Sequence, residues 1–314
     1  MKRLLLGIAL ITISLNAICA QTISKKMELG KFSSIDASFA YTINVQKGIS
    51  NSIEVIYPER FEEHLEIFVS GNVLHLETHS ANQSKNLFNK LFRQNNMSLS
   101  NDEKIIVNVK MEEIKEIDLS GAATLYVSGK FHTDHFKLSM SGASEIEGFL
   151  NIDANKFTYS LSGASEAAVA GVFNSIDGHI SGASEFELTA DATTFFSGCS
   201  GASELDFRGN ISEKTEVECS GASEVELSGK TFLIAIHCTG ASEVDAEQML
   251  STDATATASG ASYIKVHADN SFSLSSSGGS KIRYYGDGQY SPAQDGAISR
   301  GRYPSHGHFL NLSR

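Results

Sequence analysis

Residues 200–206 and 220–226 read Ser-Gly-Ala-Ser-Glu-Leu-Asp and Ser-Gly-Ala-Ser-Glu-Val-Glu, and this phrase decides the fold because it recurs along the chain. Nine versions of it occur between Ser120 and Ser280, with steps of 18 to 21 residues between their glycines. These glycines are Gly121, Gly142, Gly163, Gly182, Gly201, Gly221, Gly240, Gly260 and Gly278. A period this short predicts a solenoid, because one coil cannot bury its own apolar face and must stack on its neighbours.

Apolar and polar residues alternate on both sides of each glycine. If the glycine is position zero, apolar residues recur at −6, −4, −2, +4 and +6, as in Phe136, Leu138, Met140 and Ile146. Period-two alternation predicts strands with one buried face, and glycine permits the corner between them. We therefore predict an all-β fold, a single-stranded right-handed parallel β-helix of about nine regular coils over residues 115–288. The residues after +8 could hold a short third strand in each coil.

The first twenty residues predict a secretory signal peptide. Lys2 and Arg3 precede an apolar stretch, and a small-residue cleavage site ends at Ala20. Cys19 leaves a lipoprotein alternative open. No later stretch has the length and hydrophobicity of a transmembrane helix, so we expect no integral membrane segment.

Residues 21–290 are predicted to form one domain, with N-terminal coils or a cap before the repeats. The runs 32–45, 53–57, 73–76 and 104–109 look like strands. An insertion at 80–103 carries a short amphipathic pattern that predicts a helix around Leu87, Phe88, Leu91 and Phe92. This insertion either packs on the side or end of the solenoid, or it docks to a partner or touches a membrane. Residues 291–314 lose the alternation and predict a flexible C-terminal tail.

The charge balance argues against nucleic acid as a partner. The chain has 25 Lys and Arg against 37 Asp and Glu, a formal net charge of −12. Nucleic-acid binding depends on neutralising phosphates with basic side chains. We therefore expect no nucleic-acid partner.

Three cysteines occupy the −2 position of three consecutive coils, namely Cys199, Cys219 and Cys238. The same position elsewhere holds mostly apolar residues, which predicts a buried stack of thiols in the core. A disulfide between adjacent coils is the alternative in an oxidising compartment, although parallel Cβ vectors would strain it. A three-cysteine metal site would lack a fourth ligand.

A ladder of glutamates is the most prominent candidate site. Six coils place a carboxylate at position +3, in the residues Glu145, Glu166, Glu185, Glu204, Glu224 and Glu243. Stacked about 4.8 Å apart, each pair costs about 0.9 kcal/mol in water and several-fold more in a core. The glutamates must therefore face solvent or a cation. They are the candidates for binding Ca²⁺ between coils, although no glycine-rich calcium repeat is present.

A catalytic site is not predicted. Enzymes that act on polysaccharides also use parallel β-helices, but their carboxylates are placed uniquely in a cleft, whereas the acids here repeat with the coil. The histidines do not form the His-Glu-x-x-His zinc pattern, and His132 and His135 are expected to be surface residues. We expect no cofactor.

The chain resembles the head GIN domain family, also called DUF2807. The resemblance rests on Phe32, Ile35, Ile43, Val45 and Gly48 of the opening segment, on the strands at 73–76 and 105–107, and on the repeated Ser-Gly-Ala-Ser corner. It covers about residues 25–290. It implies a β-helical adhesin-type protein of the bacterial envelope, with no catalytic residues to carry over.

The sequence therefore predicts a secreted or envelope-associated, non-enzymatic β-solenoid that binds an unknown glycan or an envelope or host protein. It could also form a homo-oligomer. Two alternatives remain open: a polysaccharide-acting lyase or hydrolase, and a structural or assembly protein of the envelope.

Overall fold

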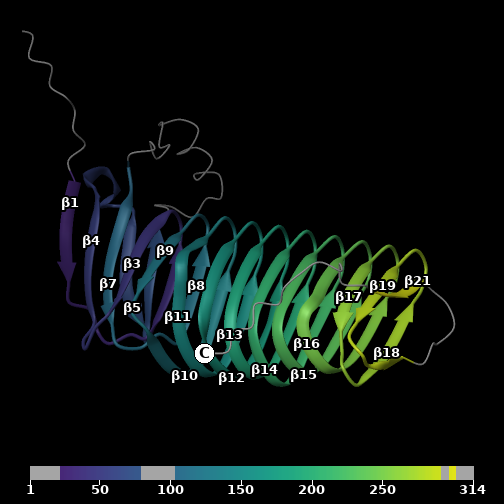
Figure 1. Ribbon diagram of the computed structural model, residues 1–314. Helices are drawn as coiled ribbons and strands as arrows, with labels where there is room; N and C mark the ends of the chain where they lie inside the picture. Colours follow the sequence, from purple (N-terminus) through teal and green to yellow (C-terminus); the bar gives the residue numbers. More distant parts are fainter. Residues whose placement is uncertain (1–21, 79–102, 291–296, 302–314) are drawn as a thin grey trace, which may run out of the picture.

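The protein is a β-solenoid whose coils stack along one axis into a rod (Figure 1). The computed structural model describes residues 22–78, 103–290 and 297–301. In these ranges 21 strands hydrogen-bond into one continuous sheet, and the only helical element is the 3-10 turn η1 (Glu59–Phe61). The predicted all-β solenoid is therefore confirmed.

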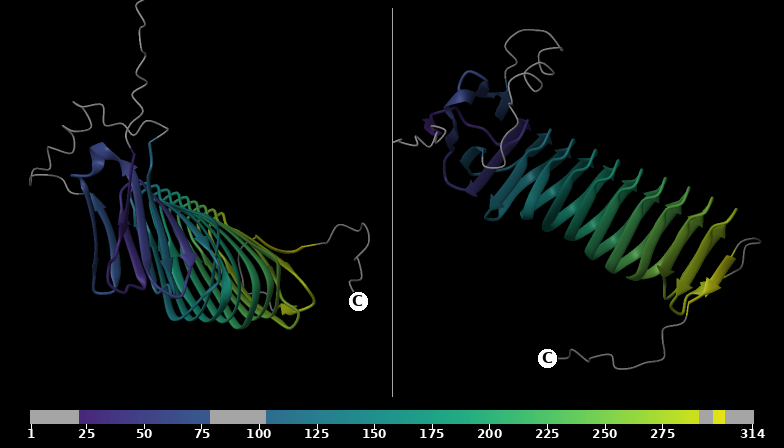
Figure 2. Two further views of the ribbon diagram at one scale, coloured as in Figure 1. Left: turned by 90° about the vertical axis from the view of Figure 1, so that its left-hand side faces the viewer. Right: turned by 90° about the horizontal axis from the view of Figure 1, so that it is seen from above.

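Six regular coils are each one long strand that runs from one glycine corner to the next and pairs in parallel with the coils on either side (Figure 2). These strands are β11 (Glu145–Leu161), β12 (Glu166–Ile180), β13 (Glu185–Cys199), β14 (Glu204–Cys219), β15 (Glu224–Cys238) and β16 (Glu243–Ala258). The coil before them is divided and ends in the shorter strand β10 (Phe131–Met140). The third strand considered from the sequence is not separate. Parallel pairing between neighbouring coils continues through that segment, as between Ala192 and Ile211. The register shifts directly after this pair.

The corners stack in a single column, and a glycine is required there. The nine corner glycines have φ between +69° and +79°, a region that other residues rarely adopt. A Cβ atom on Gly221 would lie 2.7 Å from the carbonyl oxygen of Gly201 in the previous coil. The next residue, Ala222, donates its N–H to that same oxygen at 2.7 Å. The glycine therefore allows neighbouring corners to approach closely enough to hydrogen-bond.

The last serine of the phrase is buried, because its hydroxyl serves the corner itself. Ser242 is 1% exposed, and its Oγ donates to the carbonyl oxygen of Thr239 at 2.9 Å. Equivalent bonds close the corners of Ser144, Ser165, Ser184, Ser223, Ser262 and Ser280. Ser203 is the exception, because it is equally buried but its Oγ has no hydrogen-bond partner.

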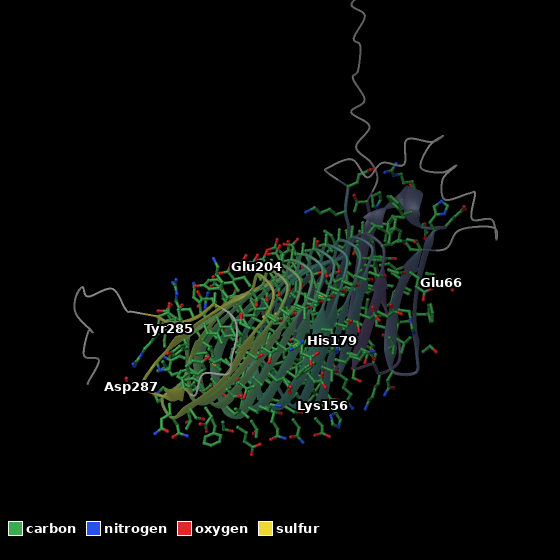
Figure 3. The ribbon with its side chains drawn as sticks, turned by 90° about the vertical axis from the view of Figure 1, so that its right-hand side faces the viewer. Glu66, Lys156, His179, Glu204, Tyr285 and Asp287 are labelled. Atoms are coloured by element: carbon green, nitrogen blue, oxygen red, sulfur yellow. The ribbon has the colours of Figure 1, made fainter. Side chains whose placement is uncertain are left out.

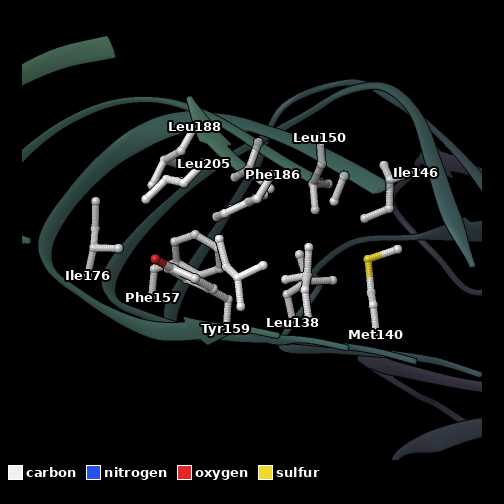
Figure 4. Close-up of a cluster of buried hydrophobic side chains, with 14 of the residues drawn as sticks. Leu138, Met140, Ile146, Leu150, Phe157, Tyr159, Ile176, Phe186, Leu188 and Leu205 are labelled. Carbon is white, nitrogen blue, oxygen red and sulfur yellow. The ribbon is translucent and has the colours of Figure 1, made fainter. Parts of the chain in front are cut away.

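The core lies between the two flat walls of each coil (Figure 4). Side chains at −6, −4 and −2 come from one wall, and those at +4 and +6 from the other. Phe157 and Tyr159 face Phe186 across the core, with ring centroids of Tyr159 and Phe186 4.7 Å apart. The ring of Tyr159 fills the space beside Gly178, where an added Cβ would lie 2.4 Å from a ring carbon. The small residue in one coil thus leaves room for the ring of the coil before it.

At the N-terminal end, the order of the coils in space differs from their order in the chain. β2 (Ser34–Ser38) and β3 (Tyr41–Lys47) form one coil; β6 (Val73–Thr78) and β7 (Ile105–Met111) form another; β8 (Glu116–Ser120) and β9 (Thr124–Ser128) form a third. β2 lies between β6 and β8, and β3 lies between β7 and β9. The first coil in the sequence is therefore the second in the stack.

Antiparallel strands close this end of the rod. β4 (Ser52–Pro58) pairs with β7, β1 (Thr22–Met27) pairs with β4, and β5 (Leu65–Ser70) pairs with β6, all antiparallel. The N-terminal region is thus both a set of coils and a cap, as the sequence allowed. The predicted signal peptide at 1–20 and the helix predicted around Leu87 lie outside the described residues.

The other end contains β17 (Tyr263–His267), β18 (Ser271–Ser276), β19 (Lys281–Tyr285), β20 (Gln289–Tyr290) and β21 (Ala297–Arg300). β21 pairs in parallel with β19, so the prediction that a flexible tail begins at residue 291 is wrong for residues 297–300. Pairing of an edge strand uses backbone groups and does not require the alternation on which the prediction depended.

Candidate functional site

The six ladder glutamates form a straight column immediately beside the corners. Each ladder glutamate is the register partner of the ladder glutamate in the next coil, from Glu145 to Glu243. Glu145 is partly exposed and the other five are exposed, as the sequence predicted. Figure 3 shows Glu204 on the upper edge of the coils, in a row of oxygen-bearing side chains.

A second acidic column lies next to the first on the same wall, two positions further along each strand. Glu187, Asp206, Glu226 and Asp245 are register partners in four successive coils. The sequence analysis missed this column, although the same repeat shows it at position +5. Glu147 also occupies +5, but a bulge in β11 takes it out of register with the coil above. The two columns together, Glu145 to Glu243 and Glu187 to Asp245, are called the acidic face below.

Crowding on the acidic face changes how its carboxylates titrate. Partial desolvation raises the pKa of Glu204, and the charges of Glu185, Glu224, Glu226 and Asp206 raise it further. The pKa of Glu145 is raised by desolvation and by Glu147 and Glu166. In both residues desolvation is the larger cause, and the neighbouring carboxylates act in the same direction.

Two basic side chains neutralise part of the second column. Arg208 lies 2.5 Å from Asp206 and 3.6 Å from Glu187, and Lys265 lies 2.5 Å from Asp245. No ion pair of a ladder glutamate at +3 with a basic side chain is seen among the described residues. The six-residue ladder is therefore the least neutralised part of the acidic face.

The acidic face does not present a ready-made calcium site. In the described part of the chain, the acidic face does not bring three ligand oxygens within 4.8 Å of one another. Ca²⁺ takes six to eight oxygen ligands, so a cation bound here would need supplementary ligands from water or from a partner. Calcium binding by Glu145, Glu166, Glu185, Glu204, Glu224 and Glu243 remains a prediction.

Beyond both ends of the acidic face, the same wall carries other kinds of side chain. Towards the C-terminal end the two columns continue as Tyr263 and Lys281 at +3 and as Lys265 and Arg283 at +5, so the charge reverses. Towards the N-terminal end there is a hollow lined in part by Asn44, Asn108, Tyr126 and Glu54. The Asn44 amide donates to the Asn108 side-chain oxygen at 2.9 Å.

The opposite wall carries both histidine and acidic side chains. A shallow hollow at Gly198 is lined by His179, Glu218 and His237, and His179 is visible on this wall in Figure 3. Elsewhere, His132 and His135 are exposed, as predicted, and lie 3.4 Å and 3.2 Å from Asp153 and Asp134. Within the described residues these groups do not form a compact acid, base and nucleophile arrangement.

Cys199, Cys219 and Cys238 are buried, and none of them is in a disulfide. Hydrogen bonding with the thiols of Cys199 and Cys238, together with burial, raises the pKa of Cys219. The same contact lowers the pKa of Cys199. The burial of all three free thiols supports the core stack.

Comparison with known proteins identifies what the chain is similar to. A family model described as "Putative auto-transporter adhesin, head GIN domain" matches residues 31–194 and 180–288. No curated protein matches the chain.

Solved structures share its fold at low sequence identity. A putative adhesin from Parabacteroides merdae is 15% identical, with a TM-score of 0.54 over 90% of this chain and 98% of its own. A putative adhesin from Parabacteroides distasonis is 14% identical, with a TM-score of 0.49, and a putative lipid binding protein from the same species is 15% identical, with a TM-score of 0.44. Both cover the same shares of the two chains. At these identities the similarity to the P. merdae protein shows the fold alone.

Proposed function

This chain belongs to the head GIN domain family, and on that premise we propose that it is a secreted or envelope-associated binding protein of the adhesin type, without enzymatic activity. The family description and the names of its structural neighbours support an adhesin-like role. No helix in the described ranges is both long and apolar enough to span a bilayer. The leader predicted at residues 1–20 supports export.

The observation that carries the proposal is the acidic face. Two neighbouring columns of carboxylates run in register along one wall, which presents the same chemistry at each coil. Repetition suits a ligand that itself repeats, such as a glycan chain or an extended polypeptide, because many weak contacts then add up. The contacting groups of that ligand are cationic, or reach the carboxylates through calcium.

The carboxylates repeat with the coil, and this supports a binding role over catalysis. Hydrolysis or lyase chemistry needs two carboxyl groups with different environments in one cleft. The four central ladder glutamates instead share one environment, with a like-charged neighbour on either side. A single coil therefore has little to distinguish it from the next.

A binding screen with the mature chain tests the proposal. Residues 21–314 are tested against glycans and extracellular-matrix proteins, with calcium and with a chelator. The variant Glu185→Gln/Glu204→Gln/Glu224→Gln should lose binding at least tenfold. A matched variant removes three charges from the opposite wall, Asp177→Asn/Glu216→Gln/Glu218→Gln, and should bind normally. Equal loss in both variants would mean that net charge, not the acidic face, is responsible.

The non-enzymatic part of the proposal has its own test. The protein is incubated with acidic polysaccharides while unsaturated and reducing ends are measured. We expect none to form. Turnover that disappears when one isolated carboxylate is replaced would overturn the proposal and favour the polysaccharide-acting alternative.

A further inference from the structure

A group of potential metal ligands lies on the wall opposite the acidic face, at the N-terminal end. Asp36 of β2 and His75 of β6 are register partners on neighbouring parallel strands, and Glu77 follows His75 by two positions. All three side chains point outward, because they alternate with buried residues. One ligand atom from each lies within 4.8 Å of the other two, and no other such group occurs in the described part of the chain.

The distances in this group fit a small ion. Nδ1 of His75 lies 3.1 Å from Oδ2 of Asp36 and 3.7 Å from Oε1 of Glu77. Ligand atoms placed about 2.0–2.1 Å from a tetrahedral Zn²⁺ are about 3.3 Å apart. The Asp36 and Glu77 oxygens lie within 4.8 Å of each other, so rotation of these two exposed side chains would bring all three ligand atoms around one ion.

The imidazole is already held in position. Phe68 of β5 is the register partner of His75, and the two rings stack with centroids 4.7 Å apart and an interplanar angle of 17°. The side chain of His75 is 21% exposed, while those of Asp36 and Glu77 are 37% and 41% exposed. Binding would thus cost little ordering of the histidine, and solvent can still reach the site.

A third acidic group stands on the far side of Asp36. Asp118 of β8 is the other register partner of Asp36, so its side chain faces the same wall. Lys137 of β10 lies on the same wall, and its Nζ donates to Glu116 at 2.6 Å. Two carboxylates therefore lie beside the imidazole, and a third lies one strand further along the stack.

We propose that Asp36, His75 and Glu77 bind a single Zn²⁺ ion, with Asp118 or water as the fourth ligand. A mixed set of imidazole and carboxylate groups suits zinc, whereas calcium and magnesium prefer oxygen alone. The ion would join β2 to β6, two strands that are adjacent in the stack but far apart in the chain. It would thereby fasten the coil that closes the N-terminal end. The proposal does not depend on the acidic face.

Zinc titration of the metal-stripped mature chain tests this site. Calorimetry of residues 21–314 should show one equivalent bound, and one equivalent of zinc should raise the melting temperature because it binds only the folded state. His75→Ala and Asp36→Asn should each weaken binding at least tenfold. His132→Ala is the matched control, because His132 also lies beside an aspartate, Asp153, but lacks a third ligand. Its zinc binding should be unchanged.

The competing interpretation is an ion pair between protonated His75 and Asp36. In that case the wild-type chain binds no zinc, and both substitutions change only the metal-free melting temperature. Equal zinc binding by wild type and both variants would also overturn the proposal, since the ion would then lie elsewhere. Metal-free circular dichroism of each variant checks folding, and Asp36→Asn keeps the shape of the side chain.

Discussion

Each central glutamate of the ladder has a like-charged neighbour above and below it. At a strand spacing of about 4.8 Å in water, such a pair costs about 0.9 kcal/mol before salt screening. The fold tolerates this cost because the side chains face solvent. A carboxylate on the acidic face is therefore a local source of instability, and its retention in six coils is consistent with a role in binding.

The pH dependence of a single substitution can measure this repulsion. The pKa of Glu204 is raised in the folded state, chiefly by desolvation and then by four neighbouring acids. The folded state therefore disfavours its ionised form above that raised pKa, and the penalty is absent below the unfolded value of about 4.3. Glu204→Gln should stabilise the protein by up to about 1 kcal/mol at pH 7.5 and by close to zero below pH 4. Thermal melts with a chelator present provide the measurement.

Glu218→Gln is the control for this prediction. Glu218 lies on the opposite wall, where its register neighbours are Gly198 and His237 and not acids. Its replacement should not stabilise the protein at pH 7.5. Equal stabilisation by both substitutions would show that the ladder repulsion is not the cause.

At the scale of the element, the glycine corner joins one coil to the next. Gly221→Ala combines a left-handed φ of +75° with a Cβ placed 2.7 Å from the oxygen and 3.0 Å from the nitrogen of Gly201. The atoms that would have to move belong to a hydrogen-bonded backbone column. We expect a loss of about 3 kcal/mol or more in the free energy of unfolding, measured by urea denaturation.

Gly148→Ala separates the cost of the left-handed backbone conformation from the cost of the clash between Cβ and the neighbouring coil. Gly148 has φ +73°, but a Cβ there would meet no atom within 4 Å. This substitution should cost only the left-handed conformation, about 1 kcal/mol. If the two alanine variants lose the same stability, close packing of the corners is not what requires glycine at Gly221.

The sequence predicted the elements where each coil repeats the same local chemistry. Glycine, the buried serine and the alternating flanks fix the corner and the two walls without any knowledge of distant residues. The N-terminal end was not predictable in this way. There Phe39, with φ 149°, occupies the corner position beneath Gly121, so the repeat cannot be seen in the sequence. The exchanged order of the first coils depends on pairings between strands that are far apart in the chain.

The same reason explains which sites could be found from the sequence. The six ladder glutamates were visible because the repeat places them together, and the second column was available at +5 but was not considered. Asp36 and His75 are 39 positions apart and meet only because β2 lies beside β6. No local sequence pattern predicts that these two residues are neighbours. β21 was missed because it is only four residues long, and Ile298 is its one side chain that packs against the core.

At the scale of the whole molecule, a solenoid has edge strands at its ends that could pair with another copy. In the described residues β1 pairs only with β4, so one of its edges faces away from the rod. β1 carries Lys25 and Lys26, both exposed. Charged side chains, lysine above all, discourage pairing between edge strands. These lysines should therefore limit end-to-end association.

Replacing both lysines tests that role. Lys25→Val/Lys26→Val keeps β1 in the sheet but removes its charge and raises its β-propensity. In sedimentation velocity this variant should form larger species as its concentration rises, whereas the wild-type chain should not. Lys214→Val/Lys230→Val adds the same two side chains on β14 and β15, which have paired neighbours on both sides. Association of the edge variant alone would locate the contact at the end of the rod, whereas association of both variants would mean that exposed valine suffices anywhere.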